Sequence, residues 1–90
     1  MNHRESTLTG ARGLKIYWQV WTPDLEPRAV VVIAHGLGEH SGRYLHVANR
    51  LVAEGYVVYA LDHRGHGRSE GTRAVIDRMD NAVADLDSLI

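Results

Sequence analysis

Runs of apolar and polar positions along the chain predict the order of its elements. Residues 5–9 fit a short first strand, and the glycine-containing stretch after them predicts a turn. Residues 15–21 alternate between two faces and are rich in β-branched and aromatic side chains, which predicts a second, half-exposed strand. Residues 29–34 are apolar on both faces, as is typical of a parallel strand that helices cover on each side.

The next segment predicts a helix between two parallel strands. A glycine-rich loop occupies residues 35–40, and Ser41 is the expected N-cap of a helix that runs to about Glu54. The apolar stripe of this helix consists of Leu45, Ala48, Leu51 and Val52. Residues 56–61 form another apolar strand, so residues 30–61 have the proportions of a right-handed β-loop-α-β crossover.

The end of the chain predicts a further helix. A polar, glycine-containing loop covers residues 62–71, and the helix is expected from about Asp80. Its inward side is expected to hold Val83, Leu86, Leu89 and Ile90. The chain stops on this stripe without a cap or a breaker, and it contains no repeat, low-complexity tract or linker. We therefore expect the α/β class, and a helix that ends on its own apolar stripe suggests a boundary imposed from outside the fold.

Composition narrows the classes of function. Ninety residues are fewer than an ordinary domain has, and ten Lys plus Arg against eleven Asp plus Glu argue against nucleic-acid binding. The chain has no cysteine, which excludes disulfides, thiolate metal sites and cysteine nucleophiles. The longest apolar run is residues 29–34, and residues 1–5 lead into no apolar core. The default expectation is a cytoplasmic chain without a signal peptide or a membrane span.

The glycine-rich loop at residues 35–40 has two chemical interpretations. In a dinucleotide-binding turn, Gly36 and Gly38 would supply the first two glycines and Asp62 would meet a ribose hydroxyl. The third glycine position is Ser41, however, and the carboxylate of Glu39 would repel a pyrophosphate. The pattern therefore fits this interpretation only in part.

The second interpretation is an oxyanion-binding loop. Ester hydrolysis passes through a tetrahedral intermediate with a negative charge on one oxygen, and preorganised backbone N–H groups lower the barrier to it. A His-Gly loop after a buried strand can supply one such group, and the amide of Leu37 is the predicted donor. Support for this loop is assigned to His35, Gly36, Gly38, Glu39 and His40.

Two long segments carry a more specific resemblance. Residues 35–44 read HGLGEHSGRY and residues 62–71 read DHRGHGRSEG, separated by one helix and one strand. Together they resemble the monoacylglycerol lipase group of the α/β-hydrolase superfamily, also described as the serine aminopeptidase S33 or lysophospholipase-like set. The resemblance covers about residues 13–90. It implies the N-terminal portion of an α/β-hydrolase fold, with two leading strands, a β-loop-α-β crossover and the start of a further helix.

The same resemblance implies a function. Members of this group are serine hydrolases that convert an acylglycerol and water into a fatty acid and glycerol, without a cofactor or a metal. The expected partner is therefore a small lipid ester such as a monoacylglycerol. Their Ser, Asp and His follow later in the chain, so these 90 residues are predicted to be inactive alone. Any peripheral membrane contact is expected through a cap region that also lies further along.

The segment at residues 67–71 satisfies the pattern Gly-x-Ser-x-Gly and offers Ser69 as a false nucleophile. A nucleophile elbow needs a strand that ends just before the serine and a helix that begins just after it. Ser69 lies eight residues beyond Leu61, and no helix start follows. The resemblance instead implies that this loop supports the site through Asp62, Arg64, Gly65, Gly67 and Ser69.

Two alternatives remain open from the sequence. A metal site could use His35, His40, His63 and His66, although neither loop has a known zinc spacing. The chain could also be a stand-alone binding module for a nucleotide or a metal. A different expectation concerns stability: with the strand order 1-2-4-3-5 of the family, residues 29–34 lose one neighbour and form an open edge. The isolated chain is then expected to be marginally stable or molten.

Overall fold

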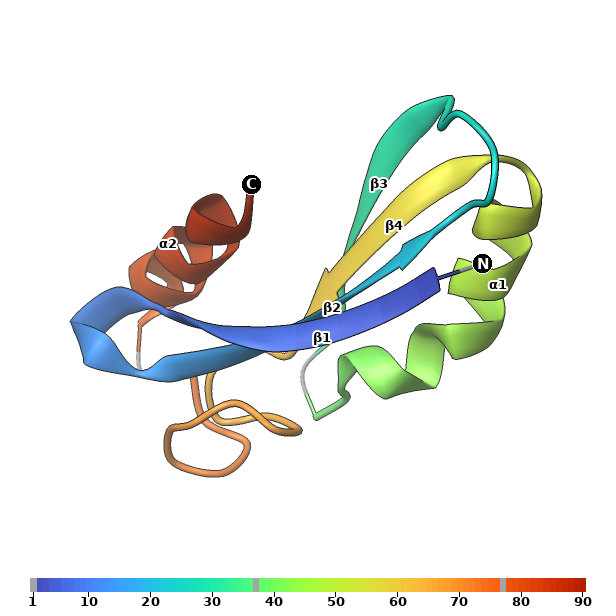
Figure 1. Cartoon of the computed structure of the whole chain (residues 1–90). Helices are drawn as coiled ribbons and strands as arrows, with labels where there is room; N and C mark the ends of the chain where they lie inside the picture. The colour runs from blue at the N-terminus through green and yellow to red at the C-terminus, as the bar shows by residue number, and fades with distance from the viewer. Residues whose placement is uncertain (1, 37, 77) are drawn as a thin grey trace.

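The fold is a four-stranded mixed sheet with one helix at each end (Figure 1). A computed structural model describes residues 2–36, 38–76 and 78–90. The strands are β1 (Asn2–Thr9), β2 (Lys15–Thr22), β3 (Ala29–Ala34) and β4 (Tyr56–Leu61). The helices are α1 (Leu45–Ala53) and α2 (Met79–Leu89), with 3₁₀ turns η1 (Ala11–Gly13) and η2 (Ser41–Tyr44). Among the described residues, no helix has the length and apolar character needed to span a bilayer.

The first two strands form a long antiparallel hairpin. Asn2 pairs with Thr22 and Thr9 pairs with Lys15, so β1 starts earlier than the expected residue 5. The extra length is polar, and period-2 alternation alone does not mark it. It is a strand because the whole length of β2 offers a partner for its backbone groups.

The parallel crossover is confirmed. β3 and β4 pair in parallel from Ala29 opposite Tyr56 to Ala34 opposite Leu61, and α1 connects them. One face of the sheet packs against α1, because the apolar stripe of the helix is presented to the strands. The buried cluster between them consists of Trp21, Ala48, Val52, Val58 and Ala60.

The expected side-chain cap at Ser41 is wrong. A 3₁₀ turn occupies Ser41–Tyr44, and α1 begins only at Leu45 without a side-chain hydrogen bond at its cap. The hydroxyl of Ser41 accepts a hydrogen bond from Nε2 of Gln19 on β2, at 2.7 Å. The Ser41 N–H donates to the Asp62 carboxylate, at 2.7 Å. Ser41 thus joins the helix start to the sheet instead of capping the helix.

The expected inward face of α2 is also partly wrong. Val83 and Ile90 are 58% and 82% exposed, whereas Leu86 and Leu89 are half-buried. The fully buried positions are Ala82 and Asp85. Asp85 forms a buried ion pair with Arg64. This pair turns the Asp85 side of α2 inward and so determines which face of the helix is buried.

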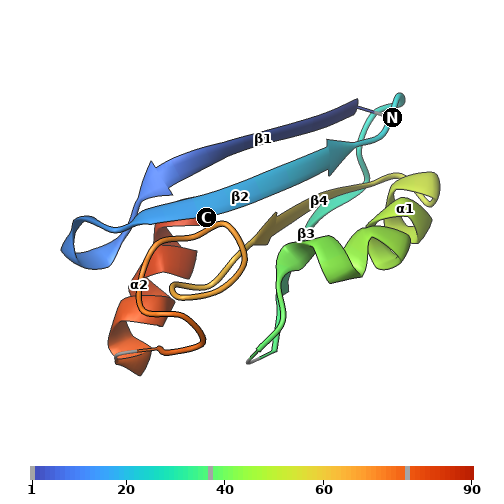
Figure 2. The ribbon, with the colours of Figure 1, turned by 90° about the horizontal axis from the view of Figure 1, so that it is seen from below.

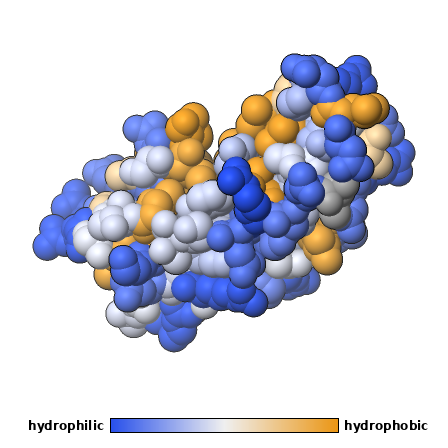
Figure 3. All heavy atoms as spheres, in the orientation of Figure 1, coloured by the Kyte–Doolittle hydropathy of each residue, from blue (hydrophilic) through white to orange (hydrophobic). Residues whose placement is uncertain are grey.

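β3 lies at the edge of the sheet. The observed order β1-β2-β4-β3 leaves its outer side without a strand partner in the described part of the chain, as the family order predicts. Val30 is 62% exposed, and Val32 is exposed on the same side of the strand. Figure 3 shows apolar surface over β3 and at the end of α2. An apolar strand with an unpaired edge invites pairing with another chain.

We expect this edge to drive self-association of the isolated chain. Val30→Lys places a charge on the exposed side of β3 and should reduce both dye binding to apolar surface and the sedimenting aggregate. Val31→Lys is the matched control: Val31 packs against the buried cluster, so the same change should unfold the chain. Equal dye binding and equal sedimentation of Val30→Lys and the unsubstituted chain would contradict the expectation.

Candidate active-site loops

Two loops meet where the parallel strands β3 and β4 end. The loop at residues 35–40 follows β3, the loop at 62–71 follows β4, and both leave the sheet on the same side (Figure 2). The His63 N–H donates to Nε2 of His35, at 2.9 Å, and the Gly38 N–H donates to Nε2 of His66, also at 2.9 Å. The carboxyl ends of parallel strands are where α/β proteins bind ligands.

A tight turn shapes the first loop. The Glu39 N–H donates to the Gly36 carbonyl at 3.1 Å, and the Glu39 carboxylate accepts from the Gly36 N–H at 2.9 Å. Gly38 has φ +80°, which favours glycine. The hydroxyl of Tyr44 also donates to Glu39, and this hydrogen bond, followed by that from Gly36, lowers the pKa of the carboxyl. Leu37, the predicted oxyanion donor, lies outside the described residues.

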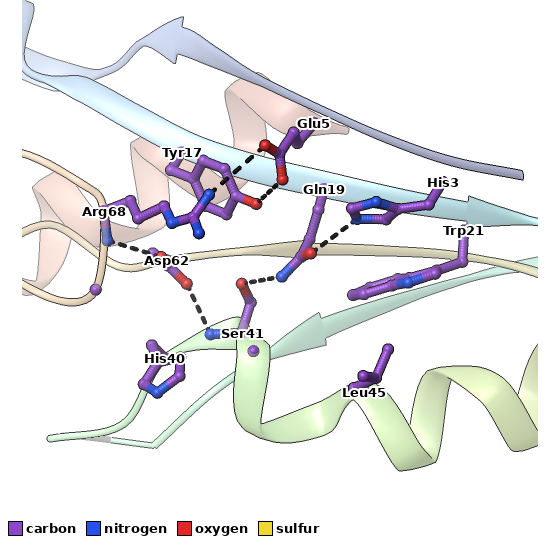
Figure 4. Close-up of a pocket in the computed structure, with 12 residues that line it drawn as sticks. His3, Glu5, Tyr17, Gln19, Trp21, His40, Ser41, Leu45, Asp62 and Arg68 are labelled. Carbon is purple, nitrogen blue, oxygen red and sulfur yellow. Dashed lines mark hydrogen bonds and ion pairs between the residues drawn. The ribbon is translucent and has the colours of Figure 1, made fainter.

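His40 stands at the junction of the first loop and η2. Its imidazole is exposed, and its carbonyl accepts the Arg43 N–H at 3.2 Å. It lines a cavity of about 660 Å³ between the β1–β2 hairpin and the start of α1 (Figure 4). His40 therefore borders both the loop and this cavity.

The polar groups of that cavity bond to one another. The Tyr17 hydroxyl donates to Glu5 at 2.6 Å, and Oε1 of Gln19 lies 2.9 Å from Nε2 of His3. Burial, and then the Glu5 carboxylate, raise the pKa of Tyr17 to about 12. Figure 4 shows that Gln19 reaches the Asp62 carboxylate through Ser41. Glu5 forms an ion pair with Arg68, whose N–H also donates to Asp62.

One carboxylate fixes the second loop. Asp62 is buried, and its two oxygens accept the N–H groups of Ser41, at 2.7 Å, and Arg68, at 2.9 Å. The Ser69 hydroxyl donates to the Asp62 carbonyl and accepts the Tyr17 N–H at 2.8 Å. Ser69 is only 3% exposed, so its hydroxyl is enclosed in structural hydrogen bonds and does not face a substrate.

Two glycines let the second loop fold back on itself. A Cβ at Gly67 would lie 2.3 Å from the Asp62 carboxylate, and one at Gly65 would lie 2.4 Å from the Thr72 carbonyl. Both residues have positive φ. Any side chain there would displace backbone or the Asp62 carboxylate, so the loop requires glycine at both positions.

A buried ion pair anchors the same loop to the rest of the fold. Nε of Arg64 lies 2.9 Å from Oδ2 of Asp85, and the side chains are 1% and 0% exposed. The other Asp85 oxygen accepts the Ala11 N–H at 2.8 Å, and Arg64 donates to the Ala11 carbonyl. Sequence reasoning expected Arg64 to bond to nearby backbone and missed Asp85. A carboxylate at an inward helix position was the available signal.

Three histidines pack between the loops. The ring centroids of His35 and His63 are 4.4 Å apart, and those of His35 and His66 are 5.2 Å apart. Burial lowers the pKa of both His35 and His63, so these imidazoles are held neutral. The ring nitrogens of His35 and His66 already bond to backbone groups. Within the described residues, no group of three potential ligands is arranged to hold a metal ion.

The fold is that of an α/β-hydrolase. The structure of the alpha/beta hydrolase GrgF from Penicillium sp. sh18 superposes with a TM-score of 0.77 at 21% identity, covering 99% of this chain and 31% of that one. Residues 25–90 match the family described as serine aminopeptidase, S33. This match covers most of the chain, and the chain belongs to that family of hydrolases.

Individual relatives indicate which group of hydrolases the chain resembles. The chain is 52% identical over 86 residues to a monoacylglycerol lipase of Mycolicibacterium smegmatis, covering 96% of this chain and 31% of the relative. It is 40% identical over 79 residues to the human monoglyceride lipase, covering 88% of this chain and 26% of the relative. The chain thus spans less than a third of the length of these relatives and resembles the monoacylglycerol lipase group.

The buried histidines predict a loss of stability in mild acid. The folded state lowers the pKa of His35 and His63 below the unfolded value near 6.5, so the unfolded chain binds more protons as the pH falls below it. The free energy of unfolding should therefore decrease from about pH 7.5 to about pH 5.5. His63→Gln should flatten this dependence, measured by urea unfolding, whereas His46→Gln on the exposed side of α1 should not. An equal slope in His63→Gln and the unsubstituted chain would contradict the assignment.

The enclosed hydroxyl of Ser69 predicts a structural role. Ser69→Ala leaves the Tyr17 N–H without its acceptor and should lower the free energy of unfolding by about 1–3 kcal/mol. Ser88→Ala, which removes an exposed hydroxyl on α2, should cost no more than about 0.5 kcal/mol. A fluorophosphonate probe should label neither the chain nor its variants. Labelling at Ser69 would overturn this role.

Proposed function

We propose that this chain is the front section of a serine hydrolase that acts on carboxylic esters of the monoacylglycerol type. The observation that carries the proposal is the glycine-rich loop at the end of β3, tied to the loop after β4 by the Gly38–His66 and His63–His35 hydrogen bonds. Sequence identity to the monoacylglycerol lipases supports the substrate class. The proposed partner is therefore a small lipid ester, and no cofactor takes part.

In this proposal the loop binds charge. A serine hydroxyl attacks the ester carbonyl, the carbonyl π electrons move to oxygen, and a tetrahedral intermediate with an oxyanion forms. The Leu37 N–H is the proposed donor to that oxygen. The support is its place between Gly36 and Gly38 in a loop at the ligand-binding end of the strands.

The attacking groups are proposed to lie outside these 90 residues. The family resemblance puts the nucleophile, acid and general base later in the chain, and the buried hydroxyl of Ser69 fits no nucleophilic role. We therefore propose that the chain alone does not hydrolyse esters. A cytoplasmic location and membrane contact through a cap region remain predictions.

The nucleotide alternative has less support. The Gly36 N–H, which would face a phosphate in a dinucleotide turn, donates to the Glu39 carboxylate. An anionic ligand would have to displace this acidic side chain and would meet its charge. An oxyanion that binds at another N–H of the loop would leave the hydrogen bond between Gly36 and Glu39 intact.

A chimaera tests the proposal. This chain would replace the aligned 86-residue segment of the M. smegmatis lipase, which then supplies the remainder of the domain. We expect the chimaera to release fatty acid from a monoacylglycerol and to react with a fluorophosphonate probe. The 90-residue chain alone should do neither with a short-chain nitrophenyl ester or the probe.

A variant of the chimaera serves as the control. A second chimaera carries Leu37→Pro, which removes the N–H of the proposed donor. It should keep its melting temperature within a few degrees and lose roughly 100-fold in kcat. A folded chimaera that does not hydrolyse esters, or a Leu37→Pro form of equal activity, refutes the proposal.

A further inference from the structure

We propose that His66 is a positioning residue for the loop after β3, and that it works as a neutral imidazole with its proton on Nδ1. The inference rests on the proposed function, because it assigns His66 the task of holding Gly38 beside the oxyanion donor. From the sequence, His66 was one of four histidines that a metal site could use. Its bonds in the structure point to another use.

The hydrogen bonds of His66 select one tautomer. Its Nε2 accepts the Gly38 N–H at 2.9 Å, so Nε2 carries no proton. Its Nδ1 lies 2.9 Å from the Arg64 carbonyl, which can only accept, so Nδ1 carries the proton. The imidazole is 3% exposed, so water cannot readily replace either partner. Protonation of Nε2 would set two N–H groups against each other and break the link to Gly38.

Backbone hydrogen bonds hold His66 in place within its loop. Its backbone N–H donates to the His63 carbonyl at 2.9 Å, and its carbonyl accepts the Ser69 N–H at 3.0 Å. Arg64, which supplies the partner of Nδ1, is held by the buried ion pair with Asp85. The His66 ring thus belongs to a loop that is held by hydrogen bonds and an ion pair on both sides of it. A hydrogen bond to a fixed ring can restrain the glycine that donates it.

Gly38 is the part of the loop that needs restraint. A glycine at φ +80° has no side chain to pack, and a Cβ there would meet nothing within 4 Å. Glycine also loses the most conformational freedom when the backbone is fixed. The hydrogen bond to His66 holds the Gly38 N–H, which adjoins the peptide unit of the proposed donor. We infer that this bond keeps the loop in the shape that binds an oxyanion.

The ring lies among other imidazoles and among charges that are already paired. The ring centroids of His35 and His63 lie 5.2 Å and 6.5 Å from that of His66. The Arg64 guanidinium adds a positive charge, which is paired with Asp85. The Asp62 carboxylate is occupied by the N–H groups of Ser41 and Arg68.

The tautomer can be measured directly. Two-bond ¹⁵N–¹H correlation spectra of the ¹⁵N-labelled chain report which ring nitrogen of His66 carries the proton. We expect a protonated Nδ1, an unprotonated Nε2 and slowed hydrogen exchange of the Gly38 amide. His66→Gln should preserve that slowed exchange, since its Oε1 can accept the same N–H, whereas His66→Leu should abolish it. A proton on Nε2, or fast exchange of Gly38 in the folded chain, overturns the proposal. If the spectrum of the isolated chain is that of a molten state, the same spectra are recorded on the chimaera.

Catalysis by the chimaera gives the second readout. His66→Leu should lower kcat roughly 10- to 100-fold with KM changed by less than about twofold, because the loop would lose its shape and not its contacts with substrate. His66→Gln should recover most of that loss, and His46→Leu should have no effect. Rates are normalised to the sites titrated by a fluorophosphonate, which removes the contribution of unfolded protein.

Failure of this inference is distinguishable from failure of the proposed function. An inactive, folded chimaera refutes the function, while the tautomer and the exchange of Gly38 still decide the role of His66. An active chimaera in which His66→Leu retains full kcat per titrated site refutes the positioning role alone.

Discussion

The buried ion pair between Arg64 and Asp85 is the contact on which the arrangement of the loops depends. Removing two charges from water is costly, and the pair persists because Ala11 supplies further hydrogen bonds to both side chains. These bonds join three parts of the chain: the loop after β4, the helix α2 and the turn between β1 and β2. The carbonyl of the same Arg64 then orients His66. A single buried charge pair thus connects the β1–β2 turn and α2 to the candidate site.

Much of the fold could be predicted from the sequence because its signals are local. The apolar runs at residues 29–34 and 56–61, with a helical stripe between them, are sufficient to indicate the parallel crossover. The strand order and the open edge came from the family resemblance. The cap at Ser41 could not be foreseen, because partners distant in the sequence, Gln19 and Asp62, compete for its polar groups. The face of α2 was misjudged for the same reason.

The same distinction applies to the candidate site: some of its features are local in the sequence, and others depend on partners in the other loop. The glycine-rich loop and the block at residues 62–71 carry their own motifs, and their meeting follows from parallel strands ending at one edge. The histidine tautomers could not be predicted, since each depends on a backbone group from the other loop. The sequence discounted Ser69 as a nucleophile because no elbow surrounds it, and the structure adds a second reason, which is burial and two hydrogen bonds.

The Asp62 carboxylate has a consequence for the order of assembly. Its hydrogen bonds to the N–H groups of Ser41 and Arg68 connect the two loops. Because these three residues are close in the sequence, a ribosome makes all of them within a short interval. In vectorial synthesis, the hydrogen bonds of Asp62 between the two loops can therefore form as soon as Arg68 has been made.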